Sequence, residues 1–225
     1  MTTPTMPTGA SGTPTRTLAV VSAGLSQPSS TRLLADRLAD ATVRELEDAG
    51  HTVRVTTIEL RDLAHAVVDA MLTRFPTGDL ARALETVTGA DGLIAVSPVF
   101  TTSYSGLFKS FWDVVDPDSL TGMPVLLGAT GGTARHSLAL EYTMRPLFTY
   151  LRADVVPTSV FAATDDWAAS ADPSTGSGGP DSGGLPKRIS RAGRELAQRV
   201  SRRENDGPAD PFAATPSFTE LLGGS

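Results

Sequence analysis

The sequence predicts a doubly wound α/β domain, in which helices cover both faces of a parallel sheet. Two observations predict it: five short runs rich in Val, Ile and Leu, and amphipathic helical patterns between them. The apolar runs mostly do not alternate with polar residues, which is typical of strands buried on both faces. Right-handed crossovers through helices then make the strands parallel. The expected strands are residues 17–22, 52–58, 92–97, 124–130 and 154–160.

Four helices are expected around these strands. The first has apolar residues on one face and stops before Gly50, a residue common just after a helix. The third contains Pro146, which predicts a kink because proline lacks the backbone N–H. The helices span residues 30–49, 104–115, 137–151 and 187–203.

Length and composition fit a single domain of this kind. The chain has 225 residues, 40% of them hydrophobic, which is enough for one sizeable core. Residues 1–15 and 204–225 are expected to be disordered tails, because they are mostly polar or interrupted by proline. Residues 170–186 are rich in Gly and Pro and are expected to form a flexible loop. The domain itself is expected over residues 16–203.

Composition also excludes several classes of protein. The chain has no cysteine, so it contains no disulfide, thiolate-bound metal or cysteine nucleophile. A net charge of −6 argues against a nucleic-acid binder. We expect no membrane association and a cytoplasmic location, because no apolar run approaches the roughly 18–20 residues of a membrane span and no signal peptide is recognisable. The three histidines form no metal-binding pair, and Pro28 disrupts the only candidate nucleophile elbow.

The loop after the first strand has the residues of a phosphate site. Small residues let the backbone approach a ligand, hydroxyls donate hydrogen bonds, and the following helix presents its N-terminus. The loop matches neither the dinucleotide fingerprint nor a Walker A motif. The alternative is an ordinary helix cap that satisfies only the first turn. The candidate phosphate contacts are Ser22, Gly24, Ser29, Ser30, Thr31 and Arg32.

The loops after the third and fourth strands suit a flat heterocycle. One offers a proline, an aromatic residue and hydroxyls, and the other offers consecutive glycine N–H groups; each could also be an ordinary connection. In the flavodoxin-like strand order 2-1-3-4-5, all three loops converge on one crevice, which predicts a mononucleotide with an aromatic base. The candidate ring contacts are Pro98, Val99, Phe100, Thr101 and Tyr104 on one loop, and Thr130, Gly131, Gly132, Thr133 and Arg135 on the other.

These motifs resemble a known family. The segments 22–32, 97–100, 104–109 and 129–133 look like those of NAD(P)H-dependent FMN reductases from two-component monooxygenase systems, over about residues 17–165. Residues 131–153 are similar to the subgroup that is paired with luciferase-like monooxygenases. A tyrosine is commoner in the family where Phe100 stands, which weakens any hydrogen-bonding role at that position.

The resemblance implies FMN and NAD(P)H as cofactors, with hydride passing directly from the nicotinamide to flavin N5 and no catalytic side chain. It also implies a homodimer or homotetramer, and a luciferase-like flavin-dependent monooxygenase that receives reduced FMN. Two alternatives stay open: a flavodoxin-like electron carrier, and an FMN-containing NAD(P)H reductase of quinones, azo compounds or metal oxyanions. Carriers are typically shorter and more acidic than this chain, whose last helix is basic. The basic helix most simply forms a solvated face, with an anionic partner or the 2′-phosphate of the cofactor as the other possibility.

Overall fold

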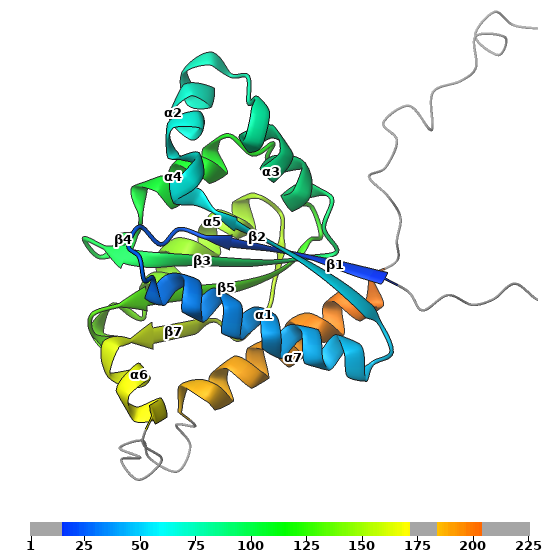
Figure 1. Ribbon diagram of the computed structural model, residues 1–225, viewed down its shortest axis with the longest axis vertical. Coiled ribbons are helices and arrows are strands. Elements are labelled where there is room, and N and C mark those ends of the chain that lie inside the picture. The colour runs from blue at the N-terminus through cyan, green and yellow to red at the C-terminus, as the bar shows by residue number, and fades with distance from the viewer. Residues whose placement is uncertain (1–14, 172–183, 204–225) are drawn as a thin grey trace, which may run out of the picture.

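A parallel sheet forms the centre of the protein (Figure 1). The computed structural model describes residues 15–171 and 184–203. The sheet order is β2-β1-β3-β5, and two short strands, β6 (Asp154–Val155) and β7 (Val160–Ala163), pair with opposite ends of β5. Counted as one interrupted strand, β6 and β7 complete the predicted order 2-1-3-4-5. The long strands are β1 (Thr15–Ser22), β2 (Thr52–Glu59), β3 (Gly92–Phe100) and β5 (Pro124–Gly131).

The last predicted strand is not continuous, so the prediction of one strand over residues 154–160 was wrong. Pro157 falls between β6 and β7 and cannot donate a ladder hydrogen bond. Two side chains make hydrogen bonds with the residues between β6 and β7 in place of a continuous ladder. The guanidinium of Arg145 donates to the carbonyls of Val156 and Pro157, both at 3.1 Å. The carboxylate of Glu195 accepts from the backbone N–H and the hydroxyl of Thr158, at 2.8 and 2.7 Å.

Successive strand residues point to opposite faces, and each face has its own helices. Leu18 and Val20 pack with α1 (Ser30–Asp48) and α7 (Leu185–Arg202), whereas Ala19 and Val21 face the other layer. Figure 1 shows the two layers above and below the sheet. This arrangement confirms the doubly wound architecture. The second layer consists of α2 (Ala64–Thr73), α3 (Gly78–Thr88), α4 (Gly106–Asp113) and α5 (Arg145–Tyr150).

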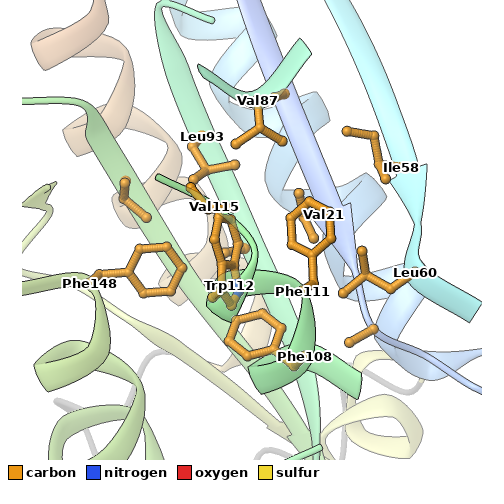
Figure 2. Close-up of a cluster of buried hydrophobic side chains, with 14 of the residues drawn as sticks. Val21, Ile58, Leu60, Val87, Leu93, Phe108, Phe111, Trp112, Val115 and Phe148 are labelled. Atoms are coloured by element: carbon orange, nitrogen blue, oxygen red, sulfur yellow. The ribbon is translucent and has the colours of Figure 1, made fainter. Parts of the chain in front are cut away.

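An aromatic cluster fills the core beneath α4 and α5 (Figure 2). The rings of Trp112 and Phe148 meet edge to face with centroids 4.8 Å apart, and Phe111 meets Trp112 at 5.1 Å. Such contacts add to the hydrophobic stabilisation of the ring burial. Trp112, Phe108 and Phe111 are therefore core residues.

The basic side chains of α7 are largely neutralised within the protein. Ion pairs join Arg188 to Asp166, Arg191 to Glu195, Arg194 to Glu45 and Arg199 to Asp154. A helix whose cations are shared with neighbouring carboxylates presents little net positive field. This supports the expected solvated face rather than a site for an anionic partner.

Several segments differ from the predictions. Between β2 and β3 the chain forms a 3₁₀ turn, η1 (Leu60–Leu63), and two helices that we did not predict, α2 and α3. The helix expected at residue 104 starts at Gly106, because β4 (Ser103–Tyr104) pairs with β3. The helix expected from residue 137 is a π-helical turn, η3 (Leu140–Met144), followed by α5. Pro146 lies in the first turn of α5, where proline is tolerated, and starts that helix instead of kinking a longer one.

The predicted tails and loop fall mostly outside the described residues. Thr15 already belongs to β1, so the first strand begins within the segment expected to be a tail. Residues 170–171 belong to α6 (Thr164–Ala171), and α7 begins at Leu185, so both ends of the predicted loop are helical. Residues 1–14, 172–183 and 204–225 are not among those that the structure describes. Within the described ranges, no helix is long and apolar enough to cross a membrane.

Candidate functional site

The three candidate loops leave the sheet at the same edge. Strands β1, β3 and β5 are neighbours, with Ser22 opposite Val96 and Pro98 opposite Thr130. A buried hydrogen bond of 2.8 Å joins the hydroxyls of Thr31 and Thr130, and so connects the first turn of α1 to the end of β5. The convergence predicted from the strand order is therefore present.

The first loop is shaped by one glycine and one serine. The side chain of Ser29 caps α1 by accepting from the N–H of Arg32 at 3.1 Å. A Cβ on Gly24 would lie 2.1 Å from Ser29 Oγ, so only glycine fits there without moving the cap. Between them, residues 25–28 are exposed. The loop therefore presents backbone and hydroxyl groups at the N-terminus of a long helix, where anions bind.

Ser22 stands out at the base of this loop. Its side chain is fully buried, and its Oγ has no hydrogen-bond partner among the described residues. A buried hydroxyl without a partner costs free energy, because it has lost its hydrogen bonds to water. This unsatisfied donor, at the end of β1, lies where the sequence predicted a phosphate contact.

Arg32 is held by carboxylates. Its Nε donates to Asp36 at 2.8 Å and its Nη1 to Glu59, at the end of β2, at 2.7 Å. The hydrogen bond to Asp36 is the main cause that raises the pKa of Arg32, and the charge of Glu59 adds to it. Two carboxylates offset the single positive charge, so Arg32 contributes much less field to a phosphate than a free guanidinium would.

The same ion pairs anchor the first loop to β2. The Nε of Arg61 lies 3.4 Å from a carboxylate oxygen of Glu59. The Nη1 of Arg61 donates at 2.7 Å to the amide oxygen of Gln27 when that amide is oriented to accept. A continuous set of polar contacts therefore runs from the first loop to the β2 edge. Sequence reasoning missed Glu59, Arg61 and Gln27. A signal was available, since residues 59–61 lie at and just beyond the end of the strand that neighbours β1.

The second loop is a tight hairpin rather than a simple strand-to-helix connection. Val99 pairs with Tyr104, and Phe100 pairs with Ser103. The two turn residues, Thr101 and Thr102, have φ values of 49° and 72°, which β-branched residues rarely adopt. Turns of this type usually contain Asn-Gly, so the threonine pair gave no hairpin signal.

The hairpin places aromatic side chains at the edge of the sheet, while the buried serines beside it make hydrogen bonds within the protein. Phe100 is 47% exposed, whereas Tyr104 is half-buried against Phe108, with ring centroids 5.7 Å apart. Ser97 Oγ accepts from the N–H of Ser105 at 3.0 Å, and Ser105 Oγ caps α4. The predicted ring contacts Pro98, Val99, Phe100, Thr101 and Tyr104 therefore occur together on one hairpin.

The third loop combines a packed glycine with an open one. A Cβ on Gly131 would lie 2.9 Å from the buried ring of Phe161, so that face of the glycine is closed by the core. A Cβ on Gly132 would meet nothing within 4 Å, and Thr133 and Arg135 are exposed. Sequence reasoning also missed Phe161.

Arg135 differs from the other cations around these loops. No described carboxylate lies within ion-pair distance of its guanidinium. By contrast, carboxylates pair with four other cations on the loops and on the helices beside them: Arg32, Arg61, Lys109 and Arg145. No group of three or more His, Asp or Glu in the described residues is arranged to hold a metal ion. The site therefore offers hydroxyls, N–H groups and one available guanidinium.

Comparison with known proteins decides the family. The family model for NADPH-dependent FMN reductase matches residues 16–168, which include all three loops. The chain belongs to this family. The fold and the three motifs are thus those of an NAD(P)H-dependent FMN reductase, an oxidoreductase with FMN and NAD(P)H as its cofactor and substrate.

Individual relatives agree with this assignment. This FMN reductase is 36% identical over 146 residues to the NADH-dependent FMN reductase SfnF of Pseudomonas putida. The aligned region covers 65% of this chain and 76% of the relative. A solved structure of an oxidoreductase from Corynebacterium diphtheriae is 47% identical, with a TM-score of 0.77, and covers 84% of this chain and 99% of that one. The apo form of the NADH:FMN oxidoreductase EmoB is 25% identical, with a TM-score of 0.67, over 87% and 92% of the two chains.

The residues of the FMN reductase fit a bound FMN. The unsatisfied hydroxyl of Ser22, the close approach at Gly24 and the free N–H groups at the start of α1 suit a phosphate. The open backbone at Gly132 and the half-exposed Phe100 suit the edge and face of a flat ring. The candidate phosphate loop carries little net positive charge, since its arginine, Arg32, is already paired with Asp36 and Glu59.

Proposed function

We propose that this FMN reductase uses FMN as a dissociable substrate, reduces it with hydride from NAD(P)H, and delivers the reduced flavin to a luciferase-like flavin-dependent monooxygenase in the cytoplasm. The observation that carries the proposal is the character of the site: three loops meet at one exposed edge and offer mainly neutral donors. Tight retention of a dianionic phosphate normally uses unshared cations or deep burial. On the first loop the arginine, Arg32, already shares its charge with two carboxylates, and residues 25–28 are exposed.

The phosphate would be held by the first loop. Ser22, Ser29, Ser30 and Thr31 supply hydroxyls, the start of α1 supplies N–H groups and a partial positive charge, and Gly24 allows close approach. Arg32 would lie at the rim of this site, with its charge shared by Asp36 and Glu59. We expect an affinity in the micromolar rather than the nanomolar range.

The ring would lie between the hairpin and the third loop. Pro98, Val99, Phe100, Thr101 and Tyr104 would line its face and edge. The chemistry that FMN supplies when bound is acceptance of a hydride from the nicotinamide ring. The protein would position the ring: backbone N–H groups at Gly131, Gly132 and Thr133 would stabilise the negative charge that reduction leaves on the pyrimidine end. No acidic or basic side chain is required, and hydride transfer needs only that the two rings stack.

NAD(P)H would bind over the exposed face of the flavin. The chain has no dinucleotide fingerprint, and the three loops would all be used by the proposed FMN site. Arg135 is the exposed cation on these loops without a carboxylate partner in the described chain, so it is the best candidate to contact the phosphates of the dinucleotide.

The test is the dependence of NAD(P)H oxidation on added FMN. Protein stripped of flavin is mixed with NADPH or NADH, and the initial rate is followed while free FMN is varied. We expect a rate that saturates with FMN, and flavin that separates from the protein on gel filtration. A rate independent of added FMN, with flavin that stays bound, would instead indicate an electron carrier or a reductase of quinones, azo compounds or metal oxyanions. Transfer is tested by adding a luciferase-like monooxygenase, whose turnover should then depend on NAD(P)H and this protein.

A further inference from the structure

Arg145 is the first residue of α5 and directly follows η3, and its guanidinium joins two segments of the chain. Nε and Nη2 donate to the two carboxylate oxygens of Glu141, at 2.5 and 3.0 Å. Nη1 and Nη2 donate to the carbonyls of Val156 and Pro157, both at 3.1 Å, and Nη2 also donates to Ser159 Oγ at 2.8 Å. These contacts, here called the Arg145 network, connect η3 to the chain between β6 and β7.

The Arg145 network contains a charged pair that is partly shielded from water. The side chain of Arg145 is 24% exposed and that of Glu141 is 48% exposed. Hydrogen bonding to Arg145 lowers the pKa of Glu141 below its ordinary value, although burial acts in the opposite direction. Glu141 is therefore ionised at neutral pH. A charged pair joined by two hydrogen bonds fixes the orientation of both side chains.

The two segments joined by the network border the third loop. On one side, the loop leads through the 3₁₀ turn η2 (Ala134–His136) into η3. On the other side, β7 begins one residue after Ser159 and pairs with the end of β5, where Gly131 lies opposite Ala163. η2 also contacts β7, and the ring of Phe161 on β7 packs against Gly131. A shift of η3 relative to β7 would therefore move the third loop.

η3 also supports the hairpin that carries the other expected ring contacts. It contacts both β4 and β5. Its apolar residues Leu140 and Met144 are buried in the core cluster against which Val99 and Tyr104 pack. Glu141 lies on the exposed side of the same turn, where it belongs to the Arg145 network. One short element therefore contacts the strands of both loops that would hold the flavin ring.

We propose that Arg145 is a positioning residue for the flavin ring, which through Glu141 and Ser159 fixes the spacing between the hairpin and the third loop. The inference rests on the proposed placement of the ring, and not on delivery of reduced flavin to a partner. Arg145 acts without touching the flavin, because its Nε, Nη1 and Nη2 already donate to protein acceptors. The first loop has its own contacts, through the Ser29 cap and the ion pairs of Arg32. Loss of the network would therefore loosen the ring half of the site and leave the phosphate half in place.

Titrations with FMN and with riboflavin separate the two halves of the site. Arg145→Lys keeps the positive charge, but a single ammonium cannot bridge Glu141 and the chain before β7 as a planar guanidinium does. The dissociation constants for FMN and riboflavin should both rise by one common factor, because riboflavin has the ring but no phosphate. That factor should be about threefold to thirtyfold, the range for residues that act on a ligand only through packed neighbours.

Arg194→Lys is the matched control. Arg194 also donates through Nε to both carboxylate oxygens of a glutamate, Glu45, but it joins α7 to α1 in the other helix layer. This variant should change neither dissociation constant. Melting temperatures are measured first, and binding is followed well below them, so that a loss of stability is not read as a loss of affinity.

Glu141→Gln is a second and milder variant, since Glu141 is exposed and the amide oxygen can still accept from Arg145. Both dissociation constants should again rise together, by a smaller factor. Lower stability of Arg145→Lys with unchanged flavin binding would show a purely structural contact and would overturn the proposal. Weaker binding of FMN alone would also overturn it, because the phosphate would then be the affected group. A wild type that bound neither flavin would overturn the ring site itself, and this proposal with it.

Discussion

The contact between Gly24 and Ser29 leads to a quantitative prediction about the first loop. An alanine at position 24 would place its Cβ 2.1 Å from Ser29 Oγ, far closer than two such atoms can approach. The hydroxyl must move, and its hydrogen bond to the N–H of Arg32 is then lost. Loss of a serine cap costs about 0.5–2 kcal/mol, commonly near 1 kcal/mol. For a domain of this size that corresponds to a fall in melting temperature of about 2–4 °C.

The structure also predicts that the two positions are coupled. In a Ser29→Ala background the offending oxygen is absent, and the nearest remaining atoms, Thr31 Cβ and the Cβ at position 29, lie 3.1 and 3.2 Å away. Gly24→Ala should therefore cost little more in that background, and the double variant should be about as stable as Ser29→Ala alone. The coupling free energy is then about 1 kcal/mol, within the range known for residues in contact.

Denaturant unfolding of the wild type, the two single variants and the double variant measures this coupling. Titrations with FMN and with riboflavin then separate phosphate binding from ring binding. We expect Gly24→Ala to weaken FMN binding several-fold more than riboflavin binding, because it disturbs the phosphate loop alone. If Gly24→Ala costs the same free energy in both backgrounds, the steric reasoning is wrong. Equal affinity of the wild type for FMN and riboflavin would contradict a phosphate site on this loop.

Three further predictions follow from the charges. Arg32→Ala should weaken FMN binding less than tenfold in a fluorescence titration. Loss of a direct and unshared charged hydrogen bond, worth about 1.5–3 kcal/mol, would weaken binding more than that. A hundredfold loss would show that the guanidinium leaves its carboxylates for the phosphate. Arg135→Ala should raise the KM for NADPH about tenfold with little change in the KM for FMN, whereas Arg152→Ala, which removes an exposed arginine paired with Asp118, should change neither. Burial of Glu195 opposes its ionisation, but hydrogen bonds from Thr158 and Arg191 outweigh burial, so its pKa lies below the ordinary glutamate value. Its contribution to stability is complete above that ordinary value and is lost as the pH falls through the lowered pKa, so Glu195→Gln should flatten the acid side of a plot of unfolding free energy against pH.

The sequence by itself determined the sheet and the position of the site. Strands buried on both faces are apolar along most of their length, so β1, β3 and β5 were recognisable from local composition, and the alternation with helices implied their parallel order. The edge strand β2 is mostly exposed and was recognisable from its Val and Ile residues. The loops that follow β1, β3 and β5 contain their ligand-binding residue types in short motifs, so these were also recognisable. Their convergence follows from strand order alone, since the carboxyl ends of neighbouring parallel strands share one edge.

Only the tertiary structure decided how the charges and turns are used. Arg32 has the same sequence context whether it faces a phosphate or carboxylates, and the choice depends on Glu59, 27 residues away in sequence and 2.7 Å away in space. The hairpin turn at Thr101 and Thr102 is imposed by pairing between β3 and β4 against the local preference of threonine. The exposure of Leu72 was equally invisible, because an apolar helix face has the same pattern whether it packs into its own core or remains uncovered. Local sequence determines which groups are available, and long-range packing determines which partners they meet.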